Sequence, residues 1–339
     1  MEAKYIISTR GKRRWEPNME KILNEIKDAK TIGIGGHVRP DGDCVGSCMA
    51  MYHYLKKNLS NNIKLDVYLE EVPKRFAIIK DTDIIKQVNE DNIIYDLFIS
   101  LDSGSLDRLG GAEAYFNQAK VTINIDHHIS NTEFGMNNHV VPDASSTCEV
   151  LFDLFDEDKI DQDVATALYL GIIHDTGVFK HSNTTKKTMN IAGKLIDKNV
   201  PFSKMIDETF YLKNYVQNQI LGRCLLKSML ILDNKCIVSY LSKNEMELYG
   251  ATSSDLDGVI DQLRITEGVE VAIFLYELDF QEFKVSMRSN GIVDVRKIVQ
   301  NYNGGGHTKA AGCSMRGTVH DVINGLTGYI ECQLLDDMN

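Results

Sequence analysis

The sequence has little of what marks a secreted or disulfide-stabilised protein. Its seven cysteines are odd in number and scattered, and no two of them form a C-x-x-C pair. A disulfide framework and a structural zinc site are therefore not expected, and a reducing cytoplasm is the predicted location. The first residues hold no long apolar segment of a secretory signal, and no stretch approaches the ~18 apolar residues of a membrane span. The sequence predicts a cytoplasmic protein without a membrane segment.

Positive charge is also in short supply. The chain has 37 Lys and Arg against 48 Asp and Glu, which gives a formal net charge of -11 at pH 7. This balance argues against a protein that coats long nucleic acid, because neutralising many phosphates requires Lys and Arg. A nucleotide substrate remains compatible with the charge, since bound metals and a few local Arg residues can reverse the field within one cleft.

Two common catalytic motifs are missing as well. The pair Gly35-Gly36 is not followed by the Lys-Ser/Thr ending of a P-loop, and no G-x-S-x-G nucleophile elbow is present. The chain therefore needs another source of chemistry than a phosphate-binding P-loop or a serine nucleophile.

The first half of the sequence alternates strand-like and helix-like runs. Strands are expected at residues 31–35, 64–69, 96–101 and 121–125, and helices at about 43–57, 106–120 and 146–155. Several strand-like runs are rich in Ile, Val and Leu on both faces, which is typical of buried parallel sheets. The fold class is therefore predicted to be α/β, with a mostly parallel sheet flanked by helices.

The second half predicts a smaller α+β domain. Two hairpins are expected, one joining residues 229–233 to 236–241 and the other joining 270–278 to 282–288. Helices are expected at 293–302 and 319–332, with a further helix start at 309–312. At 339 residues the chain can hold two domains. The expected division is 1–185 for the first domain, 186–226 for a helical linker and 227–339 for the second domain.

Four separate segments of the first half end an apolar element with Asp, His or both. They contain, in order, His37-Val38-Arg39-Pro40-Asp41-Gly42-Asp43, Asp102, Asp126-His127-His128 and His174-Asp175. In open α/β sheets, ligands bind beyond the carboxyl ends of strands, where three of these segments lie. Imidazole and carboxylate together suit a divalent metal such as Mn²⁺, with zinc and iron as competitors. Six or more such ligands exceed the needs of one ion and indicate a paired site for phosphate ester hydrolysis.

Each of these residues also has a purely structural interpretation. Asp41 or Asp43 could cap the helix that starts near Cys44, and Asp102 could cap the helix from Leu106. An isolated pair such as His127-His128 more often consists of exposed side chains without a function than of metal ligands. The glycine-rich run in the second half could be no more than a flexible loop. The metal interpretation is favoured because imidazole and several carboxylates recur at the same kind of position.

The motifs together resemble the DHH phosphoesterase family, and in particular its group with a C-terminal DHHA1 domain. The second signature is Asn303-Gly304-Gly305-Gly306-His307-Thr308-Lys309-Ala310-Ala311-Gly312, which is similar to the DHHA1 substrate loop. The resemblance extends from about Thr31 to about Ile330. The sequence differs from the usual family motif at Arg39 and Cys44, where many relatives have Asn and Ala. Neither position holds a metal ligand in the family.

The resemblance implies roles for individual residues. The implied metal ligands of two Mn²⁺ ions, with Mg²⁺ as an alternative, are His37, Asp41, Asp43, Asp102, His127 and Asp175. Asp102 would bridge the ions, His128 would face the phosphate, and Asp126 would orient an imidazole. In the second domain, Arg288 with Gly304, Gly305, Gly306 and His307 would grip the end of a short substrate.

The implied substrates are RNA oligomers of a few nucleotides and 3′-phosphoadenosine 5′-phosphate (pAp). A close alternative is hydrolysis of cyclic dinucleotides or of linear products such as pApA and pGpG. Two further alternatives stay open: a nucleotide-sensing binding protein without turnover, and a long-strand exonuclease of the RecJ type, which the acidic charge disfavours. Long DNA and membranes are not expected as partners, and the oligomeric state is open, a homodimer included.

Overall fold

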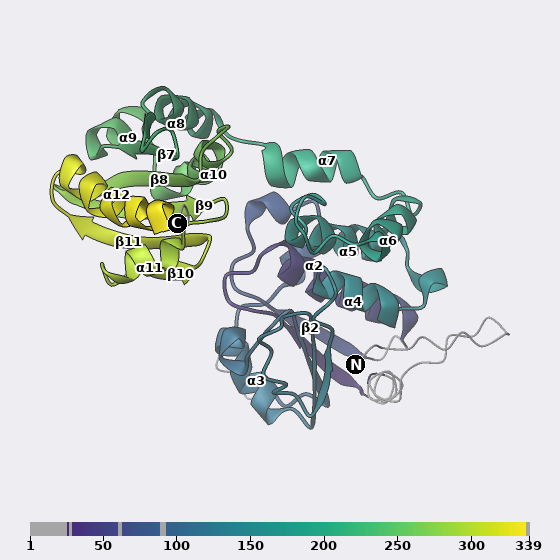
Figure 1. The fold of residues 1–339 in the computed structure, drawn as a ribbon. Coiled ribbons are helices and arrows are strands. Elements are labelled where there is room, and N and C mark those ends of the chain that lie inside the picture. Colours follow the sequence, from purple (N-terminus) through teal and green to yellow (C-terminus); the bar gives the residue numbers. More distant parts are fainter. Residues whose placement is uncertain (1–25, 27–28, 60–62, 89–92, 337–339) are drawn as a thin grey trace. The chain divides into compact units, whose positions relative to one another are not determined.

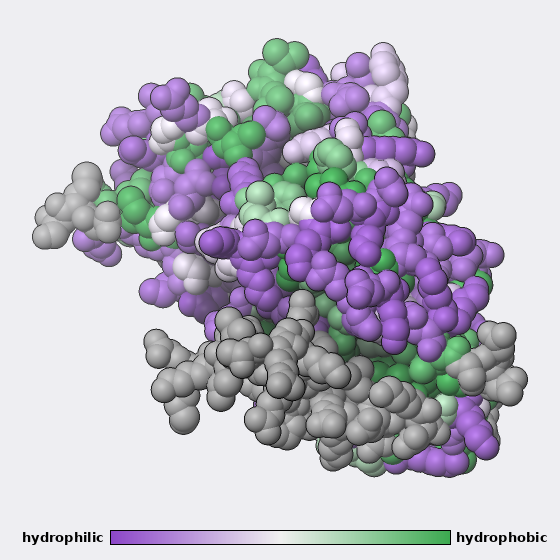
Figure 2. All heavy atoms as spheres, turned by 90° about the vertical axis from the view of Figure 1, so that its right-hand side faces the viewer, coloured by the Kyte–Doolittle hydropathy of each residue, from purple (hydrophilic) through white to green (hydrophobic). Residues whose placement is uncertain are grey.

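The computed structural model describes residues 26, 29–59, 63–88 and 93–336. The chain forms two compact units, Met1–Leu212 and Lys213–Asn339 (Figure 1). Within the described part, no helix is both long and apolar enough to cross a membrane. On the face drawn in Figure 2, hydrophilic side chains cover most of the described surface and hydrophobic ones gather in smaller patches.

The first unit is built on a five-stranded parallel sheet with the order β2-β1-β3-β4-β5. Its strands are β1 (Thr31–Gly35), β2 (Lys64–Tyr68), β3 (Leu97–Leu101), β4 (Val121–Asp126) and β5 (Asn137–Val140). The central strand β3 is buried along its whole length, as the two-sided apolar pattern predicts. The predicted parallel sheet is confirmed, and β5 is an edge strand that the sequence pattern did not reveal.

Helices cover both faces of this sheet. One face packs against α2 (Gly42–Asn58), α4 (Thr147–Leu154) and α5 (Gln162–Asp175), and the other against α3 (Glu113–Gln118). Successive side chains of β3 point to opposite faces, so Phe98 joins the α3 side while Leu97 and Ile99 join the other. Figure 1 shows α2, α4 and α5 together and α3 apart from them. The unit is completed by α6 (Lys186–Ile196), α7 (Phe202–Ile206) and a π-helical turn at Asp207–Tyr211.

The helix predicted for residues 106–120 is wrong in part. The structure has a 3₁₀ segment at Leu106–Ala112, followed by the short α3. Gly110 has φ 53° and ψ -131°, a conformation that interrupts a helix and that glycine adopts without a Cβ penalty. The remaining short 3₁₀ turns of this unit are Lys74–Phe76, Thr82–Ile84 and Glu157–Lys159.

The second unit has a six-stranded mixed sheet with the order β10-β11-β9-β8-β7-β6. Its strands are β6 (Met229–Ile231), β7 (Cys236–Leu241), β8 (Val271–Asp279), β9 (Glu282–Ser289), β10 (Gly305–His307) and β11 (Ala310–Arg316). Both predicted hairpins, β6-β7 and β8-β9, are confirmed. The helices are α8 (Tyr215–Leu226), α9 (Lys243–Tyr249), α10 (Val259–Arg264), α11 (Val295–Gln300) and α12 (Val319–Asp336), with a 3₁₀ turn at Ser253–Leu256.

The helix start expected at residues 309–312 is wrong. That segment opens strand β11, which pairs antiparallel with β10 and β9. Along β11 the side chains of Ala311, Cys313 and Met315 are buried in alternation, which is the period of a strand. The small residues of this run favoured a helix locally, but pairing with distant strands decided its conformation.

The segment 186–226, expected to be a linker, holds α6, α7 and α8. The division between the compact units falls after Leu212, so α6 and α7 belong to the first unit and α8 to the second.

Helices α2 and α5 approach each other closely because a glycine stands at their contact. A Cβ at Gly46 would lie 2.6 Å from the carbonyl oxygen of Ala167 and 3.0 Å from the backbone nitrogen of Gly171. A Cβ at Gly171 would collide with a carboxylate oxygen of Asp43 and with Cys148 Sγ. This close packing brings the start of α2 and the end of α5 together.

The contact predicts that Gly46→Ala lowers the free energy of unfolding by about 1–3 kcal/mol, because a methyl group has no room against the α5 backbone. Gly193→Ala is the matched control in α6, where no atom lies within 4 Å of the new Cβ. That change should stabilise by up to about 1 kcal/mol through helix propensity. Thermal unfolding followed by circular dichroism compares the two variants, and wild-type stability of Gly46→Ala would contradict the packing.

Candidate metal centre

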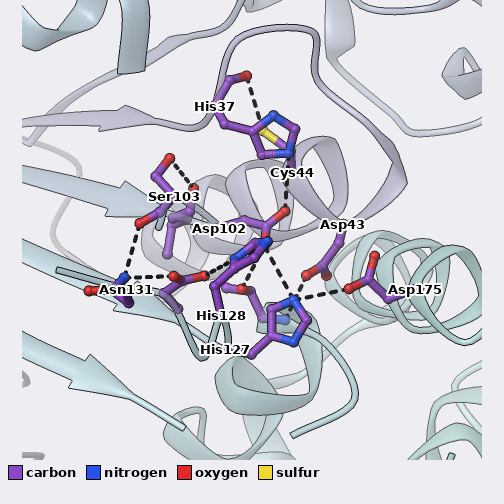
Figure 3. A network of polar contacts seen from close by, with 12 residues as sticks. His37, Asp43, Cys44, Asp102, Ser103, His127, His128, Asn131 and Asp175 are labelled. Atoms are coloured by element: carbon purple, nitrogen blue, oxygen red, sulfur yellow. Dashed lines mark hydrogen bonds and ion pairs between the residues drawn. The ribbon is translucent and has the colours of Figure 1, made fainter. Parts of the chain in front are cut away.

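The polar residues of the first unit converge at the carboxyl edge of its parallel sheet. His37 follows β1, Asp102 follows β3, and Asp126 ends β4 with His127 and His128 directly after it. Because β1, β3 and β4 are neighbours in the sheet, their loops emerge side by side. Figure 3 shows the side chains of His37, Asp102, His127 and His128 pointing toward one another. Asp43 and Asp175 reach them from α2 and α5.

Asp102 lies at the middle of the group. Its Oδ2 is 3.5 Å from His37 Nε2, and its Oδ1 is 3.7 Å from His127 Nε2. The side chain is 2% exposed, and Oδ1 accepts a hydrogen bond from Thr147 Oγ1 at 3.0 Å. The backbone of Asp102 has φ 54°, the left-handed region that few non-glycine residues adopt. Its two carboxylate oxygens therefore face two different histidines, held by a strained backbone at the end of a buried strand.

The turn after β1 supplies His37 and Asp41. Asp41 is the N-cap of α2, because its Oδ1 accepts hydrogen bonds from the backbone nitrogens of Asp43 and Cys44, each at 3.1 Å. Its other oxygen, Oδ2, lies 3.6 Å from His37 Nε2. The cap and the approach to His37 thus use different oxygens of one carboxylate. The structural interpretation of Asp41 is correct, and it leaves Oδ2 free to take a second role.

Asp43 is fully buried in the first turn of α2. Its carboxylate accepts hydrogen bonds from the backbone nitrogens of Thr147, at 2.6 Å, and Cys148, at 3.0 Å. These donors lie in the first turn of α4, where the helix dipole favours negative charge. The N-terminus of α4 therefore stabilises one of the buried carboxylates and orients it toward the group.

His127 and Asp175 form the second half of the group. His127 Nε2 lies 3.0 Å from Asp175 Oδ2, and its Nδ1 lies 3.3 Å from the carbonyl oxygen of Ala144. In the protonated ring, Nδ1 donates to that carbonyl and Nε2 donates to Asp175, and loss of the Nε2 proton would free its lone pair for a metal. The backbone oxygen of Asp175 accepts from Asn183 Nδ2 at 3.2 Å, which holds the end of α5 in place.

His128 is the most open histidine of the group, and its Nδ1 lies 3.7 Å from Asp102 Oδ1. Its side chain is 43% exposed, and its Nδ1 lies 2.8 Å from Asp126 Oδ1. Asp126 is fully buried, and its Oδ2 accepts from Asn131 Nδ2 at 2.6 Å. Asn131 also donates to the carbonyl of Ser103, at 3.0 Å, and so ties the loop after β4 to the loop after β3. The imidazole that Asp126 contacts is that of His128.

The group brings several carboxylates together in a buried place, with few positive charges to neutralise them. Burial raises the pKa of Asp43 well above its usual range, and the charges of Asp102 and Asp175 raise it further. Burial alone would lower the pKa of His37, but the carboxylates of Asp102 and Asp41 outweigh it and raise the pKa to about 12. The pKa of His127 rises to about 10, because Asp175 and its neighbours outweigh the effect of burial. Protons are held on both imidazoles by the same field that would attract a metal ion.

The donor set fits divalent cations. Ligand atoms of Asp43, His127 and Asp175 lie within 4.8 Å of one another, as do those of Asp102, His127 and His128. Mixed imidazole and carboxylate donors suit Mn²⁺, Fe²⁺ and Zn²⁺. Cys44 Sγ forms a further group of this kind with His37 and Asp102. Burial and the neighbouring Cys48 raise the pKa of the Cys44 thiol, which keeps it protonated.

The sequence-predicted residues of the second domain lie in its own sheet. His307 on β10 pairs with Ala310 on β11, and Ala310 pairs with Arg288 on β9. Directly paired residues share a face of a sheet, so His307 and Arg288 flank the small Ala310. Arg288 Nε lies 3.4 Å from Asp261 Oδ1, and His307 is exposed. A Cβ at Gly306 would lie 2.5 Å from the carbonyl oxygen of Ala310, so this glycine is required by close backbone approach.

Two residues of the first unit were missed by sequence reasoning. Thr147 contacts both Asp43 and Asp102, and its only sequence signal was its place beside the expected cap Ser146. The cap is present, since Ser146 Oγ accepts from the backbone nitrogen of Glu149 at 3.0 Å. Asn131 stands four residues after His127, and nothing in its local pattern indicated a contact with Asp126.

Comparisons with known proteins agree with this arrangement. The DHH family N-terminal domain matches residues 31–172, and the DHHA1 domain matches residues 233–328. The chain is 29% identical over 311 residues to the bifunctional oligoribonuclease and PAP phosphatase NrnA of Thermus thermophilus, with 90% of each chain covered. It is 28% identical over 302 residues to the protein of the same name from Bacillus subtilis, covering 87% of this chain and 92% of the other.

A solved structure shares the fold. The exopolyphosphatase-related protein of Bacteroides fragilis superposes with a TM-score of 0.82 at 23% identity, covering 93% of this chain and 95% of the other. The two domain matches together span more than half of the sequence and follow the family's order. The chain therefore belongs to the DHH family of phosphoesterases, in the group that carries a C-terminal DHHA1 domain.

Proposed function

We propose that this protein is a Mn²⁺-dependent hydrolase with two metal sites that degrades short RNA oligonucleotides to mononucleotides and converts pAp to AMP. The family relationship supports the phosphoesterase class. The names of the relatives from Thermus thermophilus and Bacillus subtilis support the choice of substrates. The observation that carries the proposal is the pair of Asp102 oxygens, one facing His37 and the other facing His127.

The residues divide naturally into two ligand groups that share Asp102. His37 and Asp41 would hold one ion with Asp102, and Asp43, His127 and Asp175 would hold the other. A carboxylate suits the shared position because its two oxygens can bind two cations. When bound, the metals would polarise the phosphoryl oxygens and lower the pKa of a water molecule.

His128 and Asp126 would serve the proton chemistry. Asp126 accepts from His128 Nδ1, which leaves Nε2 as the free nitrogen of a half-exposed imidazole. In this proposal His128 Nε2 donates a hydrogen bond or a proton to the phosphate and its leaving 3′ oxygen. The raised pKa of His128, caused chiefly by its hydrogen bond to Asp126, favours the protonated form that this role needs.

The second unit would bind one end of the substrate. Arg288 has the fork geometry for a phosphate, and His307, at the end of the loop Gly304–His307, lies on the same face of the sheet. In this proposal residues 1–185 carry hydrolysis, 186–226 connect, and 227–339 bind the substrate.

The first prediction concerns the shared carboxylate. Asp102→Asn should lower turnover at least ~10³-fold and reduce bound manganese below two ions per chain, because both sites lose a charged ligand. Asp107→Asn is the matched control, an exposed Asp in the following turn. Metal analysis and initial rates on both variants decide the point. Full activity of the wild-type protein in excess chelator would contradict the two-metal mechanism, and so would full activity of Asp102→Asn.

The second prediction concerns pH. Metal binding must displace the protons that His37 and His127 hold, whose pKa values are about 12 and about 10 in the metal-free protein. Below these values the apparent affinity for Mn²⁺ should therefore weaken as the pH falls, by roughly tenfold per pH unit for each displaced proton. Calorimetric titration between pH 6 and pH 8, in two buffers of different ionisation enthalpy, measures the affinity for Mn²⁺ and the number of protons released on binding. His127→Gln should flatten the slope, and a pH-independent affinity would contradict the assignment.

The third prediction identifies the substrate. With Mn²⁺, RNA of two to five nucleotides should be degraded faster than a 24-nucleotide RNA at equal concentration, with mononucleotides released from one end. pAp should yield AMP and phosphate. Gel separation and chromatography of early products, with pGpG and cyclic dinucleotides alongside, measure the preference. Dominant cleavage of dinucleotides would reassign the substrate, internal fragments of the long RNA would favour a long-strand nuclease, and binding without turnover would indicate a nucleotide sensor.

A further inference from the structure

A cation stands beside the metal centre and has no role in the scheme above. Arg108 belongs to the 3₁₀ segment Leu106–Ala112, and its carbonyl oxygen accepts from the backbone nitrogen of Val38 at 2.7 Å. A Cβ at Gly110 would lie 2.5 Å from Val38 Cγ1, so this segment packs tightly against the loop after β1. The backbone that carries Arg108 is thus fixed to the loop that carries His37.

The guanidinium of Arg108 reaches His37 itself. Arg108 Nη2 lies 3.4 Å from His37 Nδ1, which also lies 2.9 Å from the carbonyl oxygen of Val38. If Nδ1 donates its hydrogen to that carbonyl, it has no lone pair left to accept from Arg108. The contact therefore leaves the N–H donors of the guanidinium without an acceptor from the histidine.

Arg108 also differs from the other partly buried arginines in its partners. Within the described part of the chain, no carboxylate forms an ion pair with Arg108, whereas Arg288 and Arg264 pair with Asp261. Arg108 is not among the described residues with a buried polar atom that lacks a partner, so its unpaired donors are open to solvent. Guanidinium donors that are open and not paired with a carboxylate can bind an anionic ligand.

We propose that Arg108 binds a non-bridging oxygen of the substrate phosphate at the metal centre. The inference rests on the proposed function and adds a substrate-binding residue to it. One imidazole ring separates the guanidinium from the carboxylates, since His37 Nε2 faces Asp41 and Asp102 while Nδ1 faces Arg108. The inference requires the substrate phosphate to extend past the edge of the His37 ring, so that one of its oxygens meets the Arg108 fork.

The reaction gives such a contact a use. Charge on the phosphoryl oxygens grows as a phosphodiester is hydrolysed, and a fixed guanidinium stabilises that charge without reorganising. The backbone of Arg108 is held by its 3₁₀ segment, and its guanidinium already contacts His37 before the substrate binds. Lysine would supply the charge without the planar pair of donors.

The test compares Arg108→Ala and Arg108→Lys with Arg75→Ala. Arg75 is an exposed cation of the same unit that stacks on Phe76, so its removal controls for the loss of one charge. Arg108→Ala should lower kcat/KM for a dinucleotide RNA by ~10²–10³-fold, with Arg108→Lys intermediate and Arg75→Ala near wild type. Manganese content and the thermal midpoint should match wild type in all three. Added guanidinium chloride should restore part of the activity of Arg108→Ala alone.

A binding measurement separates this inference from the proposed function. Titration of 5′-AMP into the Mn²⁺-loaded proteins should give weaker binding to Arg108→Ala than to wild type or Arg75→Ala, whether or not RNA is hydrolysed. Loss of manganese from Arg108→Ala would show that Arg108 only positions His37, and would overturn the inference. Wild-type kinetics and wild-type AMP binding in Arg108→Ala would overturn it too. Absence of hydrolysis by wild-type protein would instead defeat the proposed function.

Discussion

The structure of the first unit depends on one electrostatic constraint. Asp43, Asp102 and Asp175 are gathered at the carboxyl edge of a parallel sheet, and two of the three are almost completely buried. Burial and neighbouring negative charge raise the pKa of Asp43 and of Asp175, and only cations or oriented dipoles offset the cost of such a cluster. In the metal-free protein, protons on His37 and His127 supply that compensation. Divalent metals would supply it more completely, which is why the site is best understood as a metal centre.

Other features of the unit hold these carboxylates close together. The glycine at the α2-α5 contact lets Asp43 and Asp175 approach, and the N-terminus of α4 donates two backbone hydrogen bonds to Asp43. The left-handed backbone at Asp102 presents its two oxygens to histidines on either side. A strained backbone and a buried charge are both costly to stability, and they occur together here at one functional edge.

Much of this could be predicted from sequence because the signals are local. The buried strands are continuous apolar runs, and the candidate ligands His37, Asp102 and His127 follow them directly in the sequence. The predictions that failed concerned segments whose conformation depends on pairing with strands distant in the sequence. Strand β5, Asn137–Val140, has no alternating apolar pattern, and β11 has helix-forming small residues that only its pairing with β9 and β10 overrides. The contacts of Thr147 and Arg108 are tertiary, and no spacing rule places them beside Asp102 and His37.

The central claim is that Asp102 joins two metal ions, and electron paramagnetic resonance of the Mn²⁺-loaded protein tests it most directly. Two Mn²⁺ ions bridged by one carboxylate are spin-coupled, so titration of metal-free protein should produce a coupled multi-line spectrum as the second equivalent binds. Asp102→Asn should show only the six-line spectrum of isolated Mn²⁺. Saturation of wild-type protein at one equivalent, or two equivalents with no sign of coupling, would contradict the account.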